Sequence, residues 1–314
     1  MDILLDCDPG LDDAVAIAVA ARFSNLLAVT TVGGNVGLDH TTANALAVLD
    51  LLGRPDVPVH SGHDETIRGD IPIRATEFHG RTGTGSIELP RSVRAPDSLD
   101  AVGFLAKTIR SHDGVQPLWL VASGPLTNVA YLASSAPDAF AKLDGISWMG
   151  GSATYGNATP GAEFNAFTDP EAAQIVFAAG HSNLIMSGLH LTHTVLLDRL
   201  WIDRFTAEVA GSSTAVFAEM LDYYERSQRA VTTIAGAAVH DAVAVAVATH
   251  PQLFEAQRYA VEVMTDSGAA RGMTLVDRRP YRVKAPANCS VVDAADGAAL
   301  AALIWESLLP PGIH

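Results

Sequence analysis

The sequence predicts an α/β fold in which helices flank both faces of an open, mostly parallel, doubly wound (Rossmann-like) sheet. Short apolar runs alternate along the chain with longer stretches of helical periodicity, which is the pattern of successive βαβ units. Hydrophobic residues make up 48% of the 314 residues, enough for a large buried core. No repeat, low-complexity tract or linker divides the chain, so we expect residues 1–314 to form a single domain, although the length alone would allow two.

Each short apolar run is expected to form a strand: Ile3–Asp6, Leu26–Val32, Leu118–Ala122, Gly145–Met149, Leu184–Ser187 and Tyr259–Met264. Stretches with helical periodicity lie among them: Asp12–Arg22, Asp39–Leu52, Ser98–Ser111, Leu126–Ser134, Glu171–Ala179, Thr214–Glu225 and Asp241–Thr249. The segment Thr168-Asp169-Pro170-Glu171 has the pattern of a capping box at a helix start. Two regions rich in Gly, Thr and Pro, Gly62–Pro96 and Gly150–Phe167, are expected to be long loops, which are usually functional or disordered.

Charge and cysteine content argue against several classes of function. The formal net charge is −15, whereas nucleic acids and anionic membranes are bound by basic surfaces. The sequence contains no uninterrupted run of about 18 apolar residues, so it predicts no membrane span. Its N-terminal segment lacks the basic and apolar regions of an export signal. Two cysteines, Cys7 and Cys289, are too few for a disulfide framework and suit a reducing compartment. We therefore expect a soluble, cytoplasmic protein.

The most informative segment follows the first expected strand and reads Leu4-Leu5-Asp6-Cys7-Asp8-Pro9-Gly10-Leu11-Asp12-Asp13. It places four carboxylates at the carboxyl end of a strand, where open α/β sheets bind ligands. Asp12 and Asp13 alone would suit the first turn of an ordinary helix, whose dipole favours acids, but that interpretation does not explain Asp6 and Asp8. Carboxylates this close repel one another unless they take up protons or bind a cation. Ligands that are all oxygen indicate Ca²⁺ or Mg²⁺ rather than zinc.

Two enzyme families carry acidic residues at this place. Haloacid-dehalogenase-type phosphatases bind Mg²⁺ with an Asp-x-Asp that continues into Gly and Thr or Ser, whereas this chain continues Pro9-Gly10-Leu11-Asp12-Asp13. The segment resembles more closely the signature Asp-Thr-Asp-Pro-Gly-x-Asp-Asp of the inosine–uridine-preferring nucleoside hydrolase family, with Cys7 in the Thr position. The resemblance continues in family order over about residues 2–250, through Thr31–Asn35, His79-Gly80, Ser123–Asn128, Gly156-Asn157, Glu163–Asn165, Asp169–Glu171 and His240-Asp241.

The resemblance implies a Ca²⁺-dependent enzyme that hydrolyses the N-glycosidic bond of a small-molecule ribonucleoside. Carried over position by position, the calcium ligands would be Asp8, Asp13, Asp241 and the backbone carbonyl of Ser123. Water and two ribose hydroxyls would complete a shell of six to eight oxygens, which suits calcium. Taken alone, Asp241 would be an ordinary helix cap, and Gly124-Pro125 an ordinary helix start.

The same resemblance implies which residues bind the ribose. Asp12, Asn157, Glu163 and Asn165 would contact its hydroxyls, because carboxylates and amides suit groups that both donate and accept hydrogen bonds. Phe164 would pack beside the sugar, with a core or exposed loop aromatic as the alternative. Asn35 would orient the reacting water or Asp8, and a plain turn at Gly34-Asn35 is its alternative.

For the chemistry, Asp8 is the candidate general base, since a metal makes water more acidic and a nearby carboxylate can take its proton. Water is expected to attack directly, with inversion, on an oxocarbenium-like sugar that the carboxylates stabilise. His240 and His79 are the candidates beside the leaving base, because histidine can donate a proton near neutral pH. A zinc site at His190 and His193 lacks a cysteine or a third ligand; the family usually has Asp where this chain has His190.

The base preference is the least decided point. The purine-specific branch of the family relies on tryptophans, one of them next to the position of His79, where this chain has Gly80. Tyr224 and Gln228 share a helix face and are expected to reach the base, with a solvated amphipathic helix as the alternative. We therefore expect a pyrimidine-preferring or broad hydrolase, as a homodimer or homotetramer like its relatives. The non-enzymatic alternative is a nucleoside or ribose binder that has lost catalysis.

Overall fold

A computed structural model describes residues 1–281 and 285–310 and contains an eight-stranded sheet with the strand order β3-β2-β1-β4-β5-β6-β12-β9. Neighbouring strands pair in parallel from β3 to β12, and only the edge strand β9 runs antiparallel, beside β12. The predicted open, mostly parallel, doubly wound sheet is therefore confirmed. Two short antiparallel pairs, β10 with β11 and β7 with β8, stand apart from this sheet.

The strands are β1 Asp2–Cys7, β2 Asn25–Thr31, β3 Val59–Ser61, β4 Leu118–Ala122, β5 Gly145–Met149, β6 Leu184–Ser187, β7 Leu196–Leu197, β8 Ala237–Ala238, β9 Phe254–Tyr259, β10 Val261–Val263, β11 Thr274–Val276 and β12 Cys289–Ala295. The helices are α1 Leu11–Phe23, α2 Leu38–Leu51, α3 Thr76–His79, α4 Ala101–Ser111, α5 Thr127–Ser135, α6 Pro137–Phe140, α7 Phe164–Thr168, α8 Pro170–Ala178, α9 Leu189–Thr192, α10 Arg199–Glu208, α11 Ala215–Val231, α12 His240–Thr249 and α13 Gly297–Leu308, with a short 3₁₀ turn at Pro251–Leu253.

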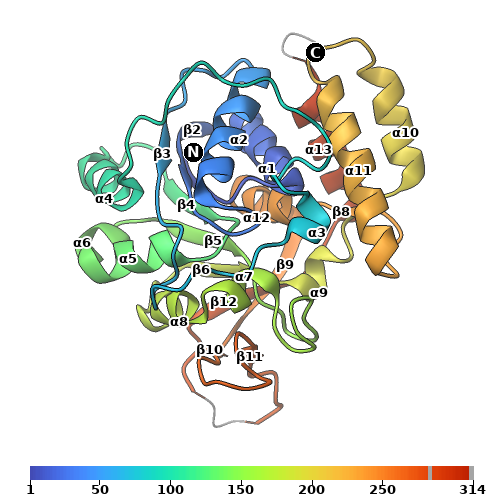
Figure 1. Cartoon of the computed structure of the whole chain (residues 1–314). Helices are drawn as coiled ribbons and strands as arrows, with labels where there is room; N and C mark the ends of the chain where they lie inside the picture. The colour runs from blue at the N-terminus through green and yellow to red at the C-terminus, as the bar shows by residue number, and fades with distance from the viewer. Residues whose placement is uncertain (282–284, 311–314) are drawn as a thin grey trace.

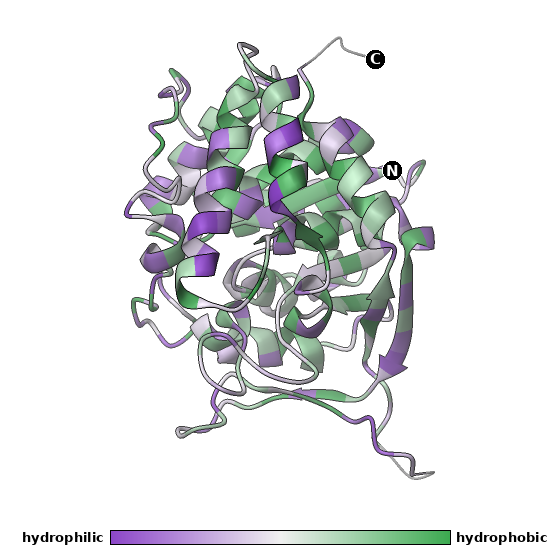
Figure 2. Ribbon diagram, turned by 90° about the vertical axis from the view of Figure 1, so that its right-hand side faces the viewer, coloured by the Kyte–Doolittle hydropathy of each residue, from purple (hydrophilic) through white to green (hydrophobic). Residues whose placement is uncertain are grey.

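Helices cover both faces of the sheet. Figure 1 shows α4, α5, α6 and α8 on one side of the strands and α1, α12 and α13 on the other, with α10 and α11 packed outside α1 and α13. Each side has its own large apolar cluster, and β1 is buried between them, with Leu5 in one cluster and Leu4 in the other. Such alternation on a strand that is buried on both faces explains its nearly continuous apolar sequence. Figure 2 shows the matching pattern, with hydrophobic residues inside and hydrophilic ones on outward helix faces.

Several element boundaries differ from the sequence-based expectation. The run Tyr259–Met264 is not one strand, because β9 ends at Tyr259 and pairs with β12, whereas β10 pairs with β11. The helix expected at Thr214–Glu225 continues to Val231, which gives Tyr224 and Gln228 a common buried face. The cap of α8 is Asp169, whose side chain accepts a hydrogen bond from the backbone N–H of Ala172; Thr168 instead donates to a backbone carbonyl within α7.

Other elements were absent from the prediction. They include strands β3, β9 and β12 and helices α10 and α13. Strand β9 reads Phe-Glu-Ala-Gln-Arg-Tyr and is mostly exposed, so its sequence has no apolar run to reveal it. No helix in the described part of the chain is long and apolar enough to cross a membrane.

The sheet order places the functional residues. The chain leaves β1 towards β2 on one side and leaves β4 towards β5 on the other, so β1 and β4 flank the point where the winding reverses. Ligands in open α/β folds bind outside the carboxyl ends of strands at this switch point. Strand β1 ends at Cys7 and β4 ends at Ala122, so Asp8 and Ser123 follow these ends directly.

Candidate active site

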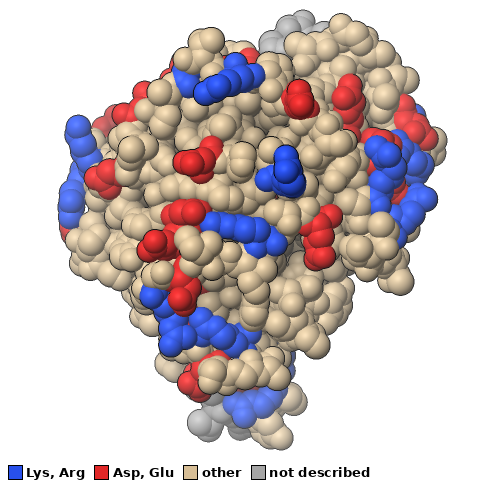
Figure 3. Space-filling model, in the orientation of Figure 1, with Lys and Arg blue, Asp and Glu red and all other residues tan. Residues whose placement is uncertain are grey.

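Four buried carboxylates meet at the switch point. Asp8 follows β1, Asp12 and Asp13 occupy the first turn of α1, and Asp241 occupies the first turn of α12. Their exposed fractions are at most 4%, so they are not among the surface acids that Figure 3 shows beside basic side chains. Oxygen atoms of Asp12, Asp13 and Asp241 all lie within 4.8 Å of one another. We call these four residues the acidic floor.

Asp8 lies beside that closest group and is held by Asn35. The backbone N–H of Asn35 donates to Asp8 Oδ2 at 2.6 Å, and its side-chain amide donates to Asp13 Oδ2 at 3.1 Å. Glycine is required around this carboxylate, since a Cβ on Gly34 would stand 2.0 Å from Asp8 Oδ2 and one on Gly124 would stand 2.6 Å from Oδ1. Asn35 therefore contacts Asp8, the contact that the sequence analysis expected as one of its two possible roles.

Asp6 does not belong to the floor, although it is the first acid of the motif. Its Oδ1 accepts hydrogen bonds from Thr30 Oγ1 at 2.5 Å and from Asn128 Nδ2 at 2.8 Å. Burial raises its pKa to about 6. Asp6 therefore ties β1 to β2 and α5 behind the site, and Asp241, which is distant in sequence, takes its place as the fourth carboxylate of the floor.

The acidic floor has the properties of a cation site. Burial, together with the charge of the neighbouring carboxylates, raises the pKa of Asp8 and Asp241 well above the usual range and that of Asp12 to about 8. None of the four forms an ion pair with Lys or Arg within residues 1–281 and 285–310. In the described part of the chain, Asp8 Oδ1 and Asp12 Oδ1 are buried without a hydrogen-bond partner. Buried carboxylates with unused oxygens fit a hard divalent metal ion.

A cavity of about 220 Å³ opens above the floor. Most of the residues proposed from the sequence line it, and Asp8 and Asp13 lie just beneath: the lining includes Asp12, Asn35, His79, Ser123, Asn157, Glu163, Phe164, Asn165, Tyr224, Gln228, His240 and Asp241. The two expected loops supply its rim through α3 and α7. Residues spread over the whole chain are thus brought to one place by the carboxyl edge of the sheet.

One end of the cavity is built around α7. Glu163 caps this helix, because its carboxylate accepts hydrogen bonds from the backbone N–H groups of Asn165, Ala166 and Gly151. Burial nevertheless raises the pKa of Glu163 to about 7. Asn157 Oδ1 accepts from the N–H of Phe164, which leaves the amide Nδ2 of Asn157 as its free donor. The α7 end is therefore ordered before any ligand arrives.

Asn165 and Ser123 join this end to the floor. Asn165 Nδ2 donates to the backbone carbonyl of Ser123 at 2.7 Å and to that of Met149 at 3.0 Å. The Ser123 hydroxyl donates to Asp13 Oδ1 at 2.8 Å. The carbonyl that was expected to bind metal thus already accepts one hydrogen bond, and its second lone pair is the one left for a cation.

The other end of the cavity is formed by α11. The Tyr224 hydroxyl donates to Asp12 Oδ2 at 3.2 Å, and Gln228 Oε1 accepts from the backbone N–H of Ala238 at 2.9 Å. The bond from Ala238 fixes the orientation of the Gln228 amide. Its N–H₂ group is the donor left to face a ligand, and Oε1 keeps a second lone pair.

Three imidazoles, His79, His193 and His240, line the cavity, and we call them the histidine wall. His79 Nδ1 accepts the backbone N–H of Leu11 at 3.1 Å, so its proton must be on Nε2. A Cβ on Gly10 would stand 2.4 Å from the same Nδ1, which is why the turn before α1 needs glycine. Burial lowers the pKa of His79 and of His193 to about 4 and that of His240 well below its usual range. All three are neutral at pH 7.

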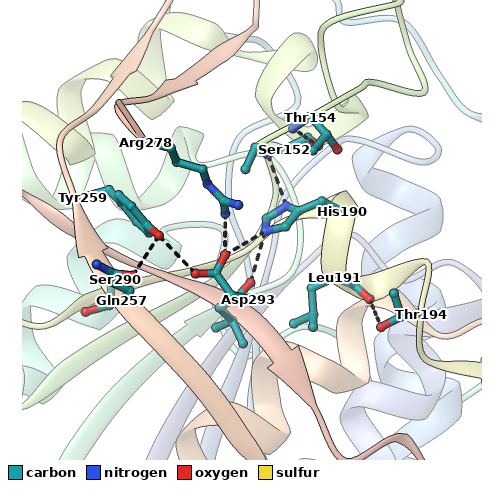
Figure 4. A network of polar contacts seen from close by, with 12 residues as sticks. Ser152, Thr154, His190, Leu191, Thr194, Gln257, Tyr259, Arg278, Ser290 and Asp293 are labelled. Carbon is teal, nitrogen blue, oxygen red and sulfur yellow. Dashed lines mark hydrogen bonds and ion pairs between the residues drawn. The ribbon is translucent and has the colours of Figure 1, made fainter. Parts of the chain in front are cut away.

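His193 is the main site residue that the sequence analysis did not select. The sequence suggests it only as a partner of His190 for zinc, and the two imidazoles bond different groups. Figure 4 shows His190 in a separate network, where its Nδ1 accepts the N–H of Ala153 and its Nε2 bonds the carbonyl of Val292. In the same network Asp293 lies 3.8 Å from His190 and pairs with Arg278. His190 therefore fastens the 150–163 loop to β12.

Other lining residues gave no sequence signal, because they belong to none of the motifs that the sequence shows. They are Ile73, Arg74, Ala75, Glu77, Phe78, Met149, Ala158, Phe167, Thr232 and Ile234. No tryptophan of the described chain lines the cavity: Trp148 is in the core, and Trp201 and Trp305 pack edge to face on each other.

Comparison with known proteins gives a consistent result. The sequence model of the inosine-uridine preferring nucleoside hydrolase family matches residues 3–302. A pyrimidine-specific ribonucleoside hydrolase RihA of Shewanella sp. (strain ANA-3) is 41% identical over 311 residues, covering 98% of this chain and 95% of the relative. The RihA of Enterobacter sp. (strain 638) is 38% identical over 296 residues, with 93% of each chain covered.

Solved structures agree with the sequence matches. The plant nucleoside hydrolase PpNRh1 superposes with a TM-score of 0.90 at 30% identity and covers 99% of both chains. A purine-preferring ribonucleoside hydrolase from Gardnerella vaginalis superposes with a TM-score of 0.89 at 29% identity and covers 98% of both chains. These similarities favour a nucleoside hydrolase over the dehalogenase-type phosphatase considered from the sequence.

Proposed function

The chain belongs to the inosine–uridine preferring nucleoside hydrolase family, and we propose that it hydrolyses pyrimidine ribonucleosides with calcium as its metal. Hydrolysis of the N-glycosidic bond of ribonucleosides is the activity of the enzyme. The observation that carries the more specific proposal is the acidic floor: four buried carboxylates, without a basic partner in the described chain, beneath a cavity of nucleoside size.

The metal would be held by Asp8, Asp13, Asp241 and the backbone carbonyl of Ser123. The unpartnered Oδ1 of Asp8 and the close oxygens of Asp13 and Asp241 support this assignment. An all-oxygen donor set fits calcium better than zinc. When bound, such an ion supplies charge neutralisation for the floor, acidifies water and chelates vicinal hydroxyls.

Asp8 is proposed as the general base. Water attacks the anomeric carbon as the bond to the base nitrogen breaks, the bonding pair leaves with the base, and Asp8 takes a proton from the water. Asn35 holds Asp8 in place by donating its backbone N–H to Oδ2. The negative floor favours the cationic character that the sugar develops. Attack from one side predicts inverted ribose.

The sugar would be bound by Asp12, Asn157, Glu163 and Asn165, with Phe164 beside it. Within the described residues Asp12 Oδ1 is buried without a hydrogen-bond partner and Asn157 is fixed through its Oδ1, so Asp12 Oδ1 and Asn157 Nδ2 suit ribose hydroxyls. Glu163 and Asn165 are held by the hydrogen bonds around α7, so they support the cavity end as well as line it. Because these groups are ordered in advance, little conformational entropy is lost when the sugar binds.

The base end favours a pyrimidine with carbonyl groups. His79 presents Nε2–H and Gln228 presents its amide N–H₂, so two donors of fixed orientation face the cavity. Uracil offers carbonyl oxygens to such donors. The relatives called pyrimidine-specific share 38 to 41% identity with this chain, whereas the purine-preferring structure from Gardnerella vaginalis shares 29%. His240 is proposed to assist the departure of the base.

A panel of ribonucleosides tests this function. Release of reducing sugar would be measured with uridine, cytidine, inosine and guanosine, with and without a chelator and with calcium restored. We expect turnover of uridine and cytidine, its loss on chelation and recovery with calcium. A kcat/KM for inosine and guanosine far above that for the pyrimidines would contradict the proposed preference. Binding without turnover of any nucleoside would identify an inactive binder instead.

Two further proposals concern the assembly and location. We propose a homodimer or homotetramer in the cytoplasm, on the basis of the family resemblance and the low cysteine content. Light scattering coupled to size-exclusion chromatography measures the assembly directly, and a monomeric mass at micromolar concentration would contradict it.

A further inference from the structure

We propose that His193, held by Tyr155, is a further base-contacting residue, which donates a hydrogen bond from Nε2 to a carbonyl oxygen of the departing base; this inference rests on the function proposed above. His193 lines the cavity together with His79 and His240. It is therefore placed to contact the substrate rather than to act only through another side chain.

The position of His193 is set by α9. His193 caps the carboxyl end of this helix, and its ring lies 5.3 Å from that of His240 between centroids, tilted by 58°. The preceding residue, Thr192, bonds His240 Nδ1 through its hydroxyl at 2.7 Å. Consecutive residues of one short helix thus orient His240 and add a second imidazole beside it. Since His240 is the residue proposed to assist the leaving base, its nearest ring neighbour lies at the same end of the cavity.

Tyr155 bonds one of the two ring nitrogens of His193 and, as the donor, would place the ring's hydrogen on the other. The Tyr155 hydroxyl lies 3.1 Å from His193 Nδ1, and the two rings stack at 5.7 Å with 25° between their planes. Within the described residues this hydroxyl has no other hydrogen-bond partner, so its own proton is available to Nδ1. A neutral imidazole whose Nδ1 accepts carries its hydrogen on Nε2. That nitrogen has no protein partner in residues 1–281 and 285–310, which leaves it for a ligand.

The other polar groups of the cavity support a base contact rather than a sugar contact. Glu163 and Asn157, at the sugar end, bond to backbone groups of α7 and not to His193. His79 presents the same donor nitrogen, fixed by the N–H of Leu11. His193 therefore adds a donor to a wall that already offers one. Donors suit a base whose edge carries carbonyl oxygens, such as uracil or the six-oxo purines.

The test compares two substrates that share a sugar. Uracil is a poor leaving group and needs hydrogen bonds from the enzyme as it departs from uridine. The p-nitrophenolate of p-nitrophenyl β-D-ribofuranoside is a good leaving group and departs without such hydrogen bonds. In His193→Ala we expect kcat/KM for uridine to fall by about 3- to 10-fold, the effect of one hydrogen bond, while the nitrophenyl substrate changes less than about 2-fold. Tyr155→Phe is expected to give a smaller loss in the same direction. His193→Gln, which restores an N–H donor, is expected to recover part of the uridine activity.

His250→Gln is the matched control. His250 ends α12 at the opposite end from His240; its Nδ1 bonds a hydroxyl, that of Thr249, at 2.9 Å, and its ring packs edge-on against Phe23. We expect neither substrate to be affected by this change. Melting temperatures of all variants show whether each is folded.

The outcomes separate the two proposals. Equal losses on both substrates in folded His193→Ala, or no loss for uridine, would overturn the role of His193 while leaving the hydrolase function standing. If the wild-type protein prefers a purine nucleoside, that nucleoside replaces uridine in the same comparison. A wild-type protein that cleaves no nucleoside would contradict both proposals.

Discussion

The acidic floor and the histidine wall are both buried, yet burial changes their chemistry in opposite directions. In the floor, burial raises the pKa of the carboxyls, as with Asp12 to about 8. In the wall, burial lowers the pKa of the imidazoles, as with His79 to about 4. Each change disfavours the charged form. Near pH 7 a bound cation therefore favours the ionised form of the floor carboxyls. The imidazoles of the wall are neutral at this pH and can donate hydrogen bonds without a bound ion.

The two regions also differ in how they are built. Three of the four floor residues come from one short segment, Asp8 to Asp13, which joins the end of β1 to the first turn of α1. The wall is assembled from α3, α9 and α12, whose histidines lie far apart in the sequence. A local motif can specify the floor, but only the complete fold specifies the wall. Damage to the floor should therefore abolish the reaction, whereas damage to the wall should change its dependence on the leaving group.

The first prediction removes the proposed base from the floor. In Asp8→Asn we expect kcat to fall by on the order of 10³-fold or more, because the variant loses a general base and a charged metal ligand together. The amide has nearly the shape of the carboxylate, so circular dichroism and the melting temperature should show an intact fold. Steady-state turnover of uridine with calcium present is the measurement.

Asp39→Asn is the control for that substitution. Asp39 also lies in the first turn of a helix, α2, but is exposed. Unchanged turnover is expected, because a solvated acid at a helix start contributes only to helix stability. Near-wild-type hydrolysis by Asp8→Asn would remove Asp8 from the mechanism.

The second prediction concerns calcium and pH. In the metal-free protein the folded state holds more protons than the unfolded chain wherever a carboxyl pKa is raised, as for Asp12 at about 8 and Glu163 at about 7. Its stability should therefore fall as the pH rises from about 6.5 to 8. His79 and His193, with pKa values near 4, act in the opposite sense, but only below the ordinary histidine value of 6.5.

Calcium should reverse this loss, since it binds the ionised floor of the folded state alone. At a concentration 100 times its dissociation constant it adds about 2.7 kcal/mol. For a chain of this size we expect the melting temperature to rise by about 4 °C, more at pH 8 than at pH 6.5. Differential scanning calorimetry at both pH values, with calcium and with chelator, tests this. A calcium effect that is larger at pH 6.5 would show that the floor is not where calcium binds.

The third prediction addresses the wall. Removing the imidazole in His240→Ala should lower kcat for uridine by up to about 10²-fold, the effect of a hydrogen bond from a neutral imidazole to a base that leaves with negative charge. The loss on p-nitrophenyl β-D-ribofuranoside should be far smaller, because its leaving group needs no such hydrogen bond. Equal losses on both substrates would show that His240 acts by positioning its neighbour Asp241 in the acidic floor, and not by contacting the leaving base.

The contrast between floor and wall also explains what the sequence could predict. The βαβ alternation and the turn after β1 are local patterns, so the sheet, α1 and the positions of Asp8, Asp12 and Asp13 followed from them. Strand β12 was missed because only the middle of Cys289–Ala295 is strongly apolar and the segment ends in polar and small residues; helix α13 follows it and was missed with it. Edge strand β9 has no apolar pattern because most of its side chains are exposed.

Hydrogen-bond partners were beyond a sequence-based prediction. His193 had no nearby motif, and only the fold brings its ring beside His240. The orientation of Gln228 depends on Ala238, which lies ten residues further along the chain. The backbone N–H of Ala238 donates a hydrogen bond to the side-chain oxygen of Gln228. Sequence patterns identify which residue types meet, whereas the atom that remains free for a ligand is decided by neighbours that the pattern does not contain.

The last and smallest prediction uses that orientation to sharpen the assignment of the wall end. Gln228→Glu keeps an oxygen for the N–H of Ala238 but replaces the donor that faces the cavity with an acceptor. Uracil carries a carbonyl where cytosine carries an amino group, so the variant should lose activity on uridine and keep more of it on cytidine. We expect the ratio of their kcat/KM values to fall by on the order of 10-fold, the effect of one hydrogen bond lost or reversed. Gln174→Glu on the exposed face of α8 is the control and should leave the ratio unchanged. If the ratio in Gln228→Glu equals that of the wild type while the protein remains folded, Gln228 does not contact the base edge, and the preference must be set by the histidines alone.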